Sequence, residues 1–353
     1  MMPRTTIKDL PFELLELILD HATSGPEYTL ESASSWSSRS HFVRNCALVS
    51  RQWRSPAQAT LWASLRVHSP ATAKRLLASP VIGLYGTRQL DLAGVHAGHE
   101  GLSGTTAARV LLKVKGVKWL RLADFGRLSV RVLQNDNLAG LRTLLLATSF
   151  PDKPATIAAL RLPFRLRSLH LFNRTYSPHV ISTLFSSSST SLESLTLLTG
   201  SSSPSYPALV RSFPLVAPNL SHFALQHRPS PALVEHFALL VRLQYLECHF
   251  AVDLASVLDA LPPSGSAAAP PLRTLSLELD YNLSDVSAVV VSRLVDPLRG
   301  PLRGLERLRI PRAPTRREFR EFGAGALLDV CDERGVVLEV GETVAWRTRM
   351  FVD

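Results

Sequence analysis

Cysteine is scarce in this chain of 353 residues, where only Cys46, Cys248 and Cys331 occur, odd in number and far apart. Such usage argues against a disulfide scaffold and for a reducing compartment. Long apolar runs are lacking too, since no stretch approaches the roughly 20 apolar residues of a membrane-spanning helix. Charges interrupt the only apolar stretch near the N-terminus, so we expect no signal peptide. The sequence therefore favours a cytoplasmic or nuclear protein, without a membrane partner.

The motifs of familiar catalytic sites are also missing. No phosphate-binding P-loop and no Gly-x-Ser-x-Gly nucleophile turn occur, and Gly323-Ala-Gly325 lacks the third glycine of a dinucleotide-binding fingerprint. The eleven histidines are dispersed, and none has Cys or carboxylate neighbours at metal-ligand spacing. We therefore expect a chain that is not an enzyme, with no catalytic residue, no cofactor and no metal.

Acidic residues are outnumbered, because 39 Lys and Arg face 29 Asp and Glu, which gives a net charge of +10. Residues 87–174 hold 14 basic and 5 acidic residues, whereas residues 177–353 hold 16 and 18. A general coding bias towards Arg explains the total but does not predict this split. Because Arg forks pair well with phosphate, the split is consistent with an acidic or phosphorylated protein substrate. Arginines stretched over solvent-facing helices are the simpler explanation.

What the sequence does contain is a recurring phrase, Leu-x-x-Leu-x-Leu. Successive copies are separated by 24, 25, 26, 28, 23, 29 and 33 residues, close to the range of roughly 20–29 that is typical of leucine-rich repeats. Weaker copies precede them at Leu65/Val67 and Leu90/Leu92. The clear phrases begin at Val117, Leu141, Leu166, Leu192, Leu220, Leu243, Leu272 and Leu305.

Each phrase predicts a short strand, because its fourth and sixth positions alternate and point to one face. Ser-Pro pairs at residues 69–70, 177–178 and 230–231 predict helix starts between phrases. One strand-helix unit cannot bury its own leucines, but a stack of units can. We therefore predict an α/β fold over residues 67–353, an irregular leucine-rich-repeat solenoid of about nine repeats, with a curved parallel sheet and outer helices. An ordinary α/β domain is the alternative.

Regular repeats usually continue with Asn or Cys at the ninth position, where a side chain satisfies buried backbone groups. This chain has neither residue there in any of the eight phrases. We therefore expect an irregular stack in which helices, rather than a ladder of side chains, satisfy the loops.

The third, fifth and seventh positions of each phrase should face away from the helices, on the side where repeat arcs bind partners. Aromatic and Arg side chains dominate the energy of protein interfaces. The predicted substrate-binding residues are therefore Trp119, Arg121, His170, Phe172, Tyr245, Arg307 and Arg309. A solvated sheet surface is the alternative for any single one of them.

Residues 5–66 do not follow the repeat and predict three helices. In the first helix Leu10, Leu14, Leu17 and Ile18 recur at the spacing of one helical face. A Ser-rich insertion at about 24–40 separates it from a second helical stretch, and a third lies near residues 56–65.

The segments DLPFELLELILDHA and CALVSRQWRSPAQATLWASL resemble an F-box, the helical module of ubiquitin-ligase receptors. An F-box followed by irregular leucine-rich repeats is similar to fungal F-box/leucine-rich-repeat proteins, although the insertion at about 24–40 departs from that family. In the family, the module docks on a Skp adaptor, which links it to a cullin and a RING subunit. By position, the resemblance implies Skp contacts at Leu10, Pro11, Leu14, Leu15, Ile18, Val49 and Trp53. The alternative places Leu14, Ile18, Val49 and Trp53 in the core of a cap on the solenoid.

The resemblance thus implies a non-catalytic substrate-recognition subunit of a Skp-cullin-F-box (SCF) ubiquitin ligase, with an unknown protein substrate on the repeats. The alternative is a repeat scaffold outside the ligase system, which binds RNA or another polyanion through its basic early repeats. That alternative ranks second because the basic region has no aromatic-rich nucleic-acid motif.

Overall fold

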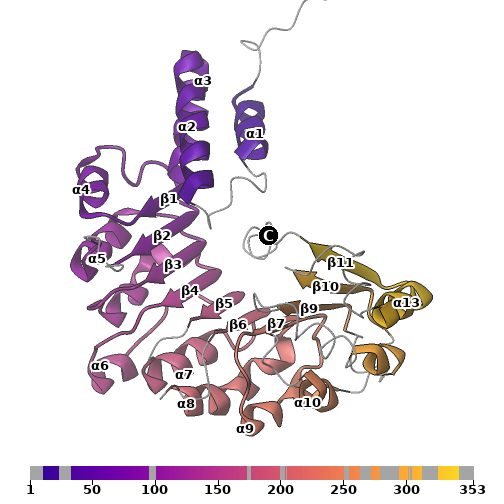
Figure 1. Ribbon diagram of the computed structural model, residues 1–353. Coiled ribbons are helices and arrows are strands. Elements are labelled where there is room, and N and C mark those ends of the chain that lie inside the picture. The colour runs from indigo at the N-terminus through magenta and orange to yellow at the C-terminus, as the bar shows by residue number, and fades with distance from the viewer. Residues whose placement is uncertain are drawn as a thin grey trace, which may run out of the picture. The chain divides into compact units, whose positions relative to one another are not determined.

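A computed structural model describes residues 11–23, 33–94, 101–172, 176–198, 203, 205–249, 254–262, 272–278, 294–300, 302, 304–311 and 325–341 (Figure 1). The chain divides into two compact units. The first unit comprises Met1–Arg121, Asn135–Leu141 and Val344–Asp353, and the second comprises Leu122–Gln134 and Arg142–Thr343. Leu10, one of the predicted Skp contacts, lies outside the described residues.

Three helices form the N-terminal module: α1 (Phe12–Thr23), α2 (Ala33–Val49) and α3 (Arg51–Ala63). Leu19, Val43 and Ala57, one from each helix, form its buried core, with Trp53 packed beside them. Helix α2 begins at Ala33, so much of the predicted Ser-rich insertion is helical. Ser and Ala cost a helix little, and a helix that is anchored at Val43 can extend towards its N-terminus by adding one hydrogen bond per residue.

The strands that the structure describes join into one sheet in chain order, from β1 to β11. Pairing is parallel between β1 and β2 and from β4 through to β11. This sheet confirms an α/β fold with a repeat-like parallel arrangement, which is compatible with leucine-rich repeats. The strands are β1 (Ser64–Val67), β2 (Gln89–Ala93), β3 (Trp119–Ala123), β4 (Thr143–Ala147), β5 (Ser168–Leu171), β6 (Ser194–Leu197), β7 (His222–Leu225), β8 (Tyr245–His249), β9 (Thr274–Glu278), β10 (Arg307–Pro311) and β11 (Val337–Gly341).

Every predicted phrase coincides with a strand. The side chains at the first, fourth and sixth positions of all eight phrases are buried, and none is more than 8% exposed. The fourth position of each phrase lies level with that of the next, as in the pairs Leu169 with Leu195 and Leu195 with Phe223. The leucines of one repeat are therefore covered by those of its neighbours, as the phrase predicts.

A repeated hydrogen-bond pattern fixes this register. The carbonyl of the residue just before a strand accepts from two consecutive N–H groups of the next repeat, at 2.7 to 3.0 Å. Arg142, for example, accepts from Arg167 and Ser168, and Arg167 accepts from Glu193 and Ser194. Because a slip of one residue would break this pairing and turn the leucines to the opposite face, the register is strongly specified.

Helices follow the strands and lie on one face of the sheet within each unit (Figure 1). They are α4 (Pro70–Ala78), α5 (Gly104–Lys113), α6 (Pro154–Ala158), α7 (Pro178–Ser187), α8 (Tyr206–Ser212), α9 (Pro231–Val234), α10 (Leu254–Ala260) and α13 (Gly325–Arg334). Short 3₁₀ helices occupy Val130–Gln134, Asp136–Leu138, Phe213–Leu215, Ala217–Asn219 and Phe237–Leu239. In the part of the chain described, none of the helices has the length and apolar character needed to cross a bilayer.

The three helices predicted from Ser-Pro pairs begin where expected. Pro70, Pro178 and Pro231 are each the first residue of a helix. Ser69 and Ser230 also cap their helices, since their hydroxyls accept hydrogen bonds from the N–H groups of Thr72 and Leu233.

We expected helices to satisfy the polar backbone groups of the loops, but side chains also form hydrogen bonds with these groups. The Thr148 hydroxyl donates to the Phe125 carbonyl at 2.9 Å and accepts from the Phe125 N–H at 3.2 Å. The Tyr176 hydroxyl lies 2.6 Å from the carbonyl of Leu146 and 2.8 Å from that of Phe172. Side chains of different types thus form hydrogen bonds with the backbone in single loops, whereas in a regular repeat an Asn ladder does so in every loop.

The β7 phrase carries Phe223 where most phrases carry Leu, and the packing explains why. Phe213, Phe223 and Phe237 form a buried cluster whose ring centroids lie 5.4, 5.6 and 6.1 Å apart. Tilted and edge-on rings at these distances contribute about 0.5–1.5 kcal/mol per pair beyond area burial.

We predict that Phe223→Ala lowers the free energy of unfolding of its cooperative unit by about 3–5 kcal/mol, because it leaves a cavity. Phe223→Leu, although it restores the common phrase, should still cost about 1 kcal/mol, since two ring contacts are lost. Urea denaturation followed by circular dichroism measures both changes. Leu215→Ala is the control, because Leu215 is 50% exposed and should cost little. Equal effects of the Phe223→Ala and Leu215→Ala variants would refute this description of the core.

Candidate interaction sites

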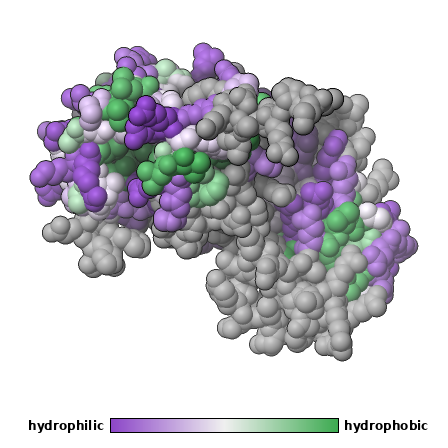
Figure 2. Space-filling model, turned by 90° about the horizontal axis from the view of Figure 1, so that it is seen from above, coloured by the Kyte–Doolittle hydropathy of each residue, from purple (hydrophilic) through white to green (hydrophobic). Residues whose placement is uncertain are grey.

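The N-terminal module carries exposed apolar side chains on two of its helices. On α1, Leu14, Leu17 and Ile18 share one face at i, i+3 and i+4 and are 44%, 62% and 44% exposed. On α2, Leu48 and Val49 are 81% and 72% exposed. We call these five residues the module surface. Figure 2 shows apolar patches among hydrophilic residues on the side seen from above.

Helix α1 is more apolar than its own packing requires. Leu15 and Leu19 are fully buried, and Leu19 packs with Val43 of α2 and Ala57 of α3. The residues of the module surface are exposed and do not belong to that core. Exposed apolar clusters of this kind are typical of protein-interaction sites.

The predicted Skp contacts divide into surface and core. Pro11 is exposed just before α1, and Leu14, Ile18 and Val49 lie on the module surface. Leu15 is instead a core residue, and Trp53 is half-buried against the same core. Sequence reasoning missed Leu17 and Leu48 as surface residues, although the i+3 spacing from Leu14 to Leu17 was visible.

The predicted substrate contacts lie on the face of the sheet away from the leucines, at phrase positions three and five, except Phe172, which is at position seven. We call this the second face. Three of the seven predicted contacts, Trp119, His170 and Tyr245, are less than 10% exposed there. Neighbouring strands of a sheet lie about 4.8 Å apart, so large side chains at matching positions cover one another. His170, for example, sits between Leu145 and Thr196 on the adjacent strands.

Burial also sets the chemistry of these residues. Loss of water lowers the pKa of His170 to about 3, so its imidazole is neutral at physiological pH, and its Nε2 lies 2.8 Å from the Ser168 hydroxyl. Burial raises the pKa of the Tyr245 hydroxyl, and the ring of Tyr245 stacks on that of His222 at 5.5 Å. These side chains are parts of the packed sheet.

Of the remaining predicted contacts, Phe172 is half-buried. The two arginines of β10 form ion pairs with the last strand. Arg307 Nε lies 3.2 Å and Arg309 Nε 2.6 Å from the carboxylate of Glu339 on β11. A single carboxylate thus holds two guanidinium groups, each of which is partly exposed.

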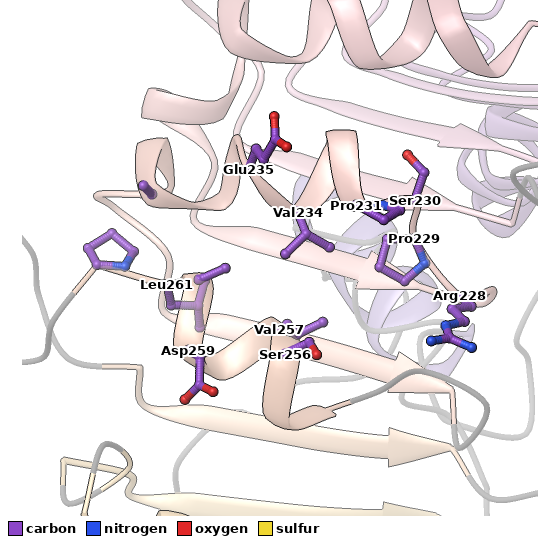
Figure 3. Close-up of a pocket in the computed structure, with 13 residues that line it drawn as sticks. Arg228, Pro229, Ser230, Pro231, Val234, Glu235, Ser256, Val257, Asp259 and Leu261 are labelled. Carbon is purple, nitrogen blue, oxygen red and sulfur yellow. The ribbon is translucent and has the colours of Figure 1, made fainter.

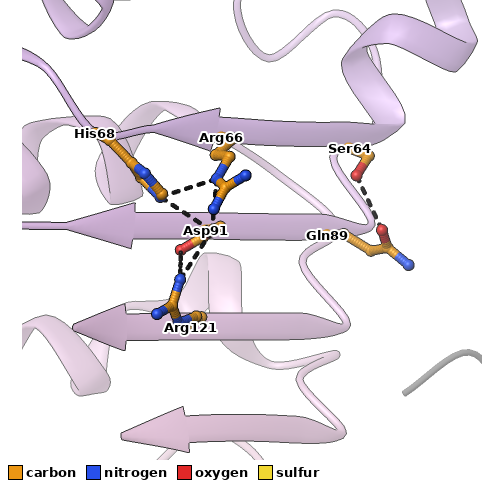
Figure 4. Close-up of polar contacts among 6 residues, drawn as sticks. All are labelled: Ser64, Arg66, His68, Gln89, Asp91 and Arg121. Carbon is orange, nitrogen blue, oxygen red and sulfur yellow. Dashed lines mark hydrogen bonds and ion pairs between the residues drawn. The ribbon is translucent and has the colours of Figure 1, made fainter. Parts of the chain in front are cut away.

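The most concentrated group of charges on the second face surrounds Asp91 (Figure 4). Asp91 is 1% exposed, and its Oδ2 lies 3.2 Å from Arg66 Nε, 3.0 Å from His68 Nε2 and 3.2 Å from Arg121 Nη1. Arg121 Nη1 also approaches Oδ1 at 3.3 Å. We call Arg66, His68, Asp91 and Arg121 the Asp91 cluster. It brings a predicted substrate contact, Arg121, together with three residues that sequence reasoning did not select.

His68 Nε2 contacts both Arg66 and Asp91. The Nε–H of Arg66 donates to His68 Nε2 at 3.4 Å, and the same ring nitrogen lies 3.0 Å from Oδ2 of Asp91. Arg66 Nε also forms an ion pair with Oδ2 of Asp91 at 3.2 Å, so the three side chains form one network.

Strand register explains how the Asp91 cluster assembles. Arg66 and Asp91 are paired across β1 and β2, and Ser64 donates to Gln89 at 2.9 Å two residues earlier on the same strands. Arg66, Asp91 and Arg121 all stand at the fifth position of their phrases. The signal was therefore present in the sequence, provided that the weak phrases at Leu65 and Leu90 are aligned with the clear ones.

The carboxyl group of Asp91 is ionised in the folded protein. Burial alone raises its pKa, but the hydrogen bond from His68 and the charges of Arg121 and Arg66 outweigh burial, so the pKa lies below its ordinary value. A carboxylate whose pKa is lowered by folding stabilises the fold at pH values above its unfolded pKa of about 3.9.

A groove of about 950 Å³ lies in the second unit, beside α9 and α10 (Figure 3). Pro231, Val234, Val257 and Leu261 give it an apolar wall, and Arg228 and Asp259 bring opposite charges to its lining. The described residues contain no group of three or more His, Cys, Asp or Glu that could hold a metal ion.

No protein-family model matches the chain, and no curated protein matches it in sequence.

We predict that Asp91→Asn lowers the free energy of unfolding by about 3 kcal/mol at pH 7, since two guanidinium groups lose their buried partner. The difference between the two proteins should vanish as the pH falls through the lowered pKa of Asp91, because the native carboxyl group then becomes neutral as well. Urea denaturation at intervals from pH 7 to pH 3 measures the difference.

Asp136→Asn is the matched control, because Asp136 is an exposed carboxylate in the same unit. It should change stability by no more than about 0.5 kcal/mol at pH 7. A difference between Asp91→Asn and the native chain that stays constant down to pH 3 would contradict the electrostatic role given to Asp91.

Proposed function

We propose that this chain is a non-catalytic substrate receptor of an SCF-type ubiquitin ligase. The module surface would bind a Skp-family adaptor, and the second face of the sheet would bind a protein substrate. The observation that carries the proposal is the exposure of Leu14, Ile18 and Val49, three positions at which the F-box resemblance implies adaptor contacts.

The energetics of the module support an adaptor. Burial of one large aliphatic side chain contributes about 1.5–3 kcal/mol. The five residues of the module surface leave much of that free energy unused, and a partner that covers them would recover it. The buried core of Leu19, Val43 and Ala57 gives the surface a fixed backing.

The junction between the module and the sheet supports a receptor that holds its substrate at a set distance from its adaptor. Helix α3 ends at Ala63 and β1 begins at Ser64, with no linker between them. The carbonyl of Ala63 accepts from the Arg88 N–H at 2.8 Å, and the Tyr85 hydroxyl donates to Gln58 on α3 at 3.1 Å. In this proposal, the cullin and RING partners carry out ubiquitin transfer, and this chain positions the substrate.

A polyanion-binding scaffold is the second candidate. It is favoured by the charge of residues 64–122, where nine basic residues face two acidic ones. A scaffold of this kind would bind single-stranded RNA with a steep dependence on salt.

We predict that the triple substitution Leu14→Glu, Ile18→Glu, Val49→Glu weakens binding of the full chain to a purified Skp-family adaptor by at least about a thousandfold. Loss of about 1.5 kcal/mol at each of three buried contacts corresponds to that factor. Because all three side chains are exposed in the free chain, its thermal melting should hardly change. Surface plasmon resonance measures the affinity.

Leu112→Glu is the control, since Leu112 on α5 is 65% exposed and lies outside the module. It should bind the adaptor as the native chain does. Equal affinity of the triple variant and the native chain would overturn the assigned contacts. If the native chain binds no adaptor, the ligase role itself is wrong.

A further inference from the structure

The Asp91 cluster has more positive charge than its own carboxylate can balance. Arg66, Asp91 and Arg121 are the only charged residues in strands β1, β2 and β3. Two guanidinium groups against one carboxylate leave a net charge of +1. An excess cation on a sheet face is stabilised by an anion from outside.

Asp91 itself orients the cations and offers nothing to a ligand. It is 1% exposed, and its oxygens are engaged by Arg66, His68 and Arg121. The side chains of Arg66, His68 and Arg121 are more accessible, at 16%, 35% and 32% exposed. Their inner atoms are held by Asp91, so they are fixed in place before any ligand arrives, and binding need not order them.

The donors that remain suit an oxyanion. A guanidinium group has five N–H donors in a planar fork. Arg66 Nε donates to His68 Nε2 and lies 3.2 Å from Asp91 Oδ2, and Arg121 Nη1 donates to Asp91. Within the residues that the structure describes, no partner is found for the two Nη atoms of Arg66 or for Nη2 of Arg121. These atoms project from strands on both sides of β2 (Figure 4).

A phosphoryl group fits these donors better than a single carboxylate does. A phosphate monoester carries nearly two negative charges and three acceptor oxygens, enough to meet two forks at once. The net charge of +1 on the cluster adds to the attraction for such an anion. The excess of nine basic over two acidic residues in 64–122 adds long-range attraction.

The surroundings favour a phosphorylated protein segment over a nucleic acid. Single-stranded nucleic acid binds through exposed aromatic rings on which its bases stack. Trp119 is the only aromatic residue of strands β1 to β3, and it is 6% exposed. A nucleic acid would also need basic side chains that continue along the sheet to contact successive phosphates. The next two phrases have Leu145 and His170 at the fifth position, so no arginine follows Arg121 there.

From this geometry we infer that the Asp91 cluster is a binding site for the phosphoryl group of a phosphorylated protein segment. The site deepens the proposed function, because its ligand would be the substrate of the receptor. It is independent of the adaptor, so it can be tested without one.

The test uses the full chain and a fluorescent library of short peptides with a central phosphoserine and degenerate flanks. The same library with serine is the reference probe, and polarisation reports binding. The phosphoserine library should bind at least tenfold more tightly than the serine library. If the two bind equally, or if neither binds, the site is refuted, whatever the adaptor does.

The decisive variant is Arg66→Gln, Asp91→Asn, Arg121→Gln. It removes the buried carboxylate together with its partners, so no unpaired buried charge is left to unfold the chain. It should lose the preference for phosphoserine and keep its circular dichroism spectrum. If the variant folds and keeps that preference, the assignment to the Asp91 cluster is overturned.

The matched control is Arg88→Gln, Lys118→Gln. Both residues are exposed, lie just before β2 and β3, and make no contact with Asp91. The control removes more net charge than the decisive variant does, and the preference for phosphoserine should change less than twofold. A single-stranded oligoribonucleotide is the competing probe. If it binds more tightly than the phosphoserine library and loses affinity in the decisive variant, the ligand is a nucleic acid and the inference is wrong.

Discussion

Each repeat of this chain can bury its leucines only against the next repeat. The constraint lies in the phrase itself, whose first, fourth and sixth side chains are buried throughout. The carbonyl before most strands accepts from two N–H groups of the following repeat, which fixes that contact at one register. The rest of the structure depends on this arrangement, because the same register decides which residues meet on the second face.

The polar sites are consequences of that register. Arg66 and Asp91 are neighbours because β1 and β2 pair as they do, and Arg309 meets Glu339 through the pairing of β10 with β11. In both places one carboxylate organises two arginines on a sheet. They differ in burial, since Asp91 is fully buried and Glu339 is largely exposed. A buried carboxylate holds its partners more firmly because water competes less, which makes the Asp91 cluster the better preorganised of the two.

Strands, helix starts and core leucines were predictable from the sequence, since each rests on a local pattern that the structure repeats. Strand β11 was missed because Val337, Leu338 and Val340 lack the phrase. Side-chain accessibility was less predictable. His170 and Tyr245 have the right residue types at outward positions, yet their cross-strand neighbours bury them. Leu15 was assigned to an interface by its position in the F-box resemblance, whereas only the folded module shows that its side chain is fully buried.

The central claim is that the exposed face of α1 and α2 is the adaptor-binding surface of an otherwise complete module. Amide hydrogen exchange of the full chain, with and without a saturating Skp-family adaptor, tests it most directly. The account predicts slower exchange in Phe12–Thr23 and Ala33–Val49 when the adaptor is present, with the strands of both units unchanged. Unchanged exchange in both helices, or protection that falls on the repeat strands instead, would contradict it.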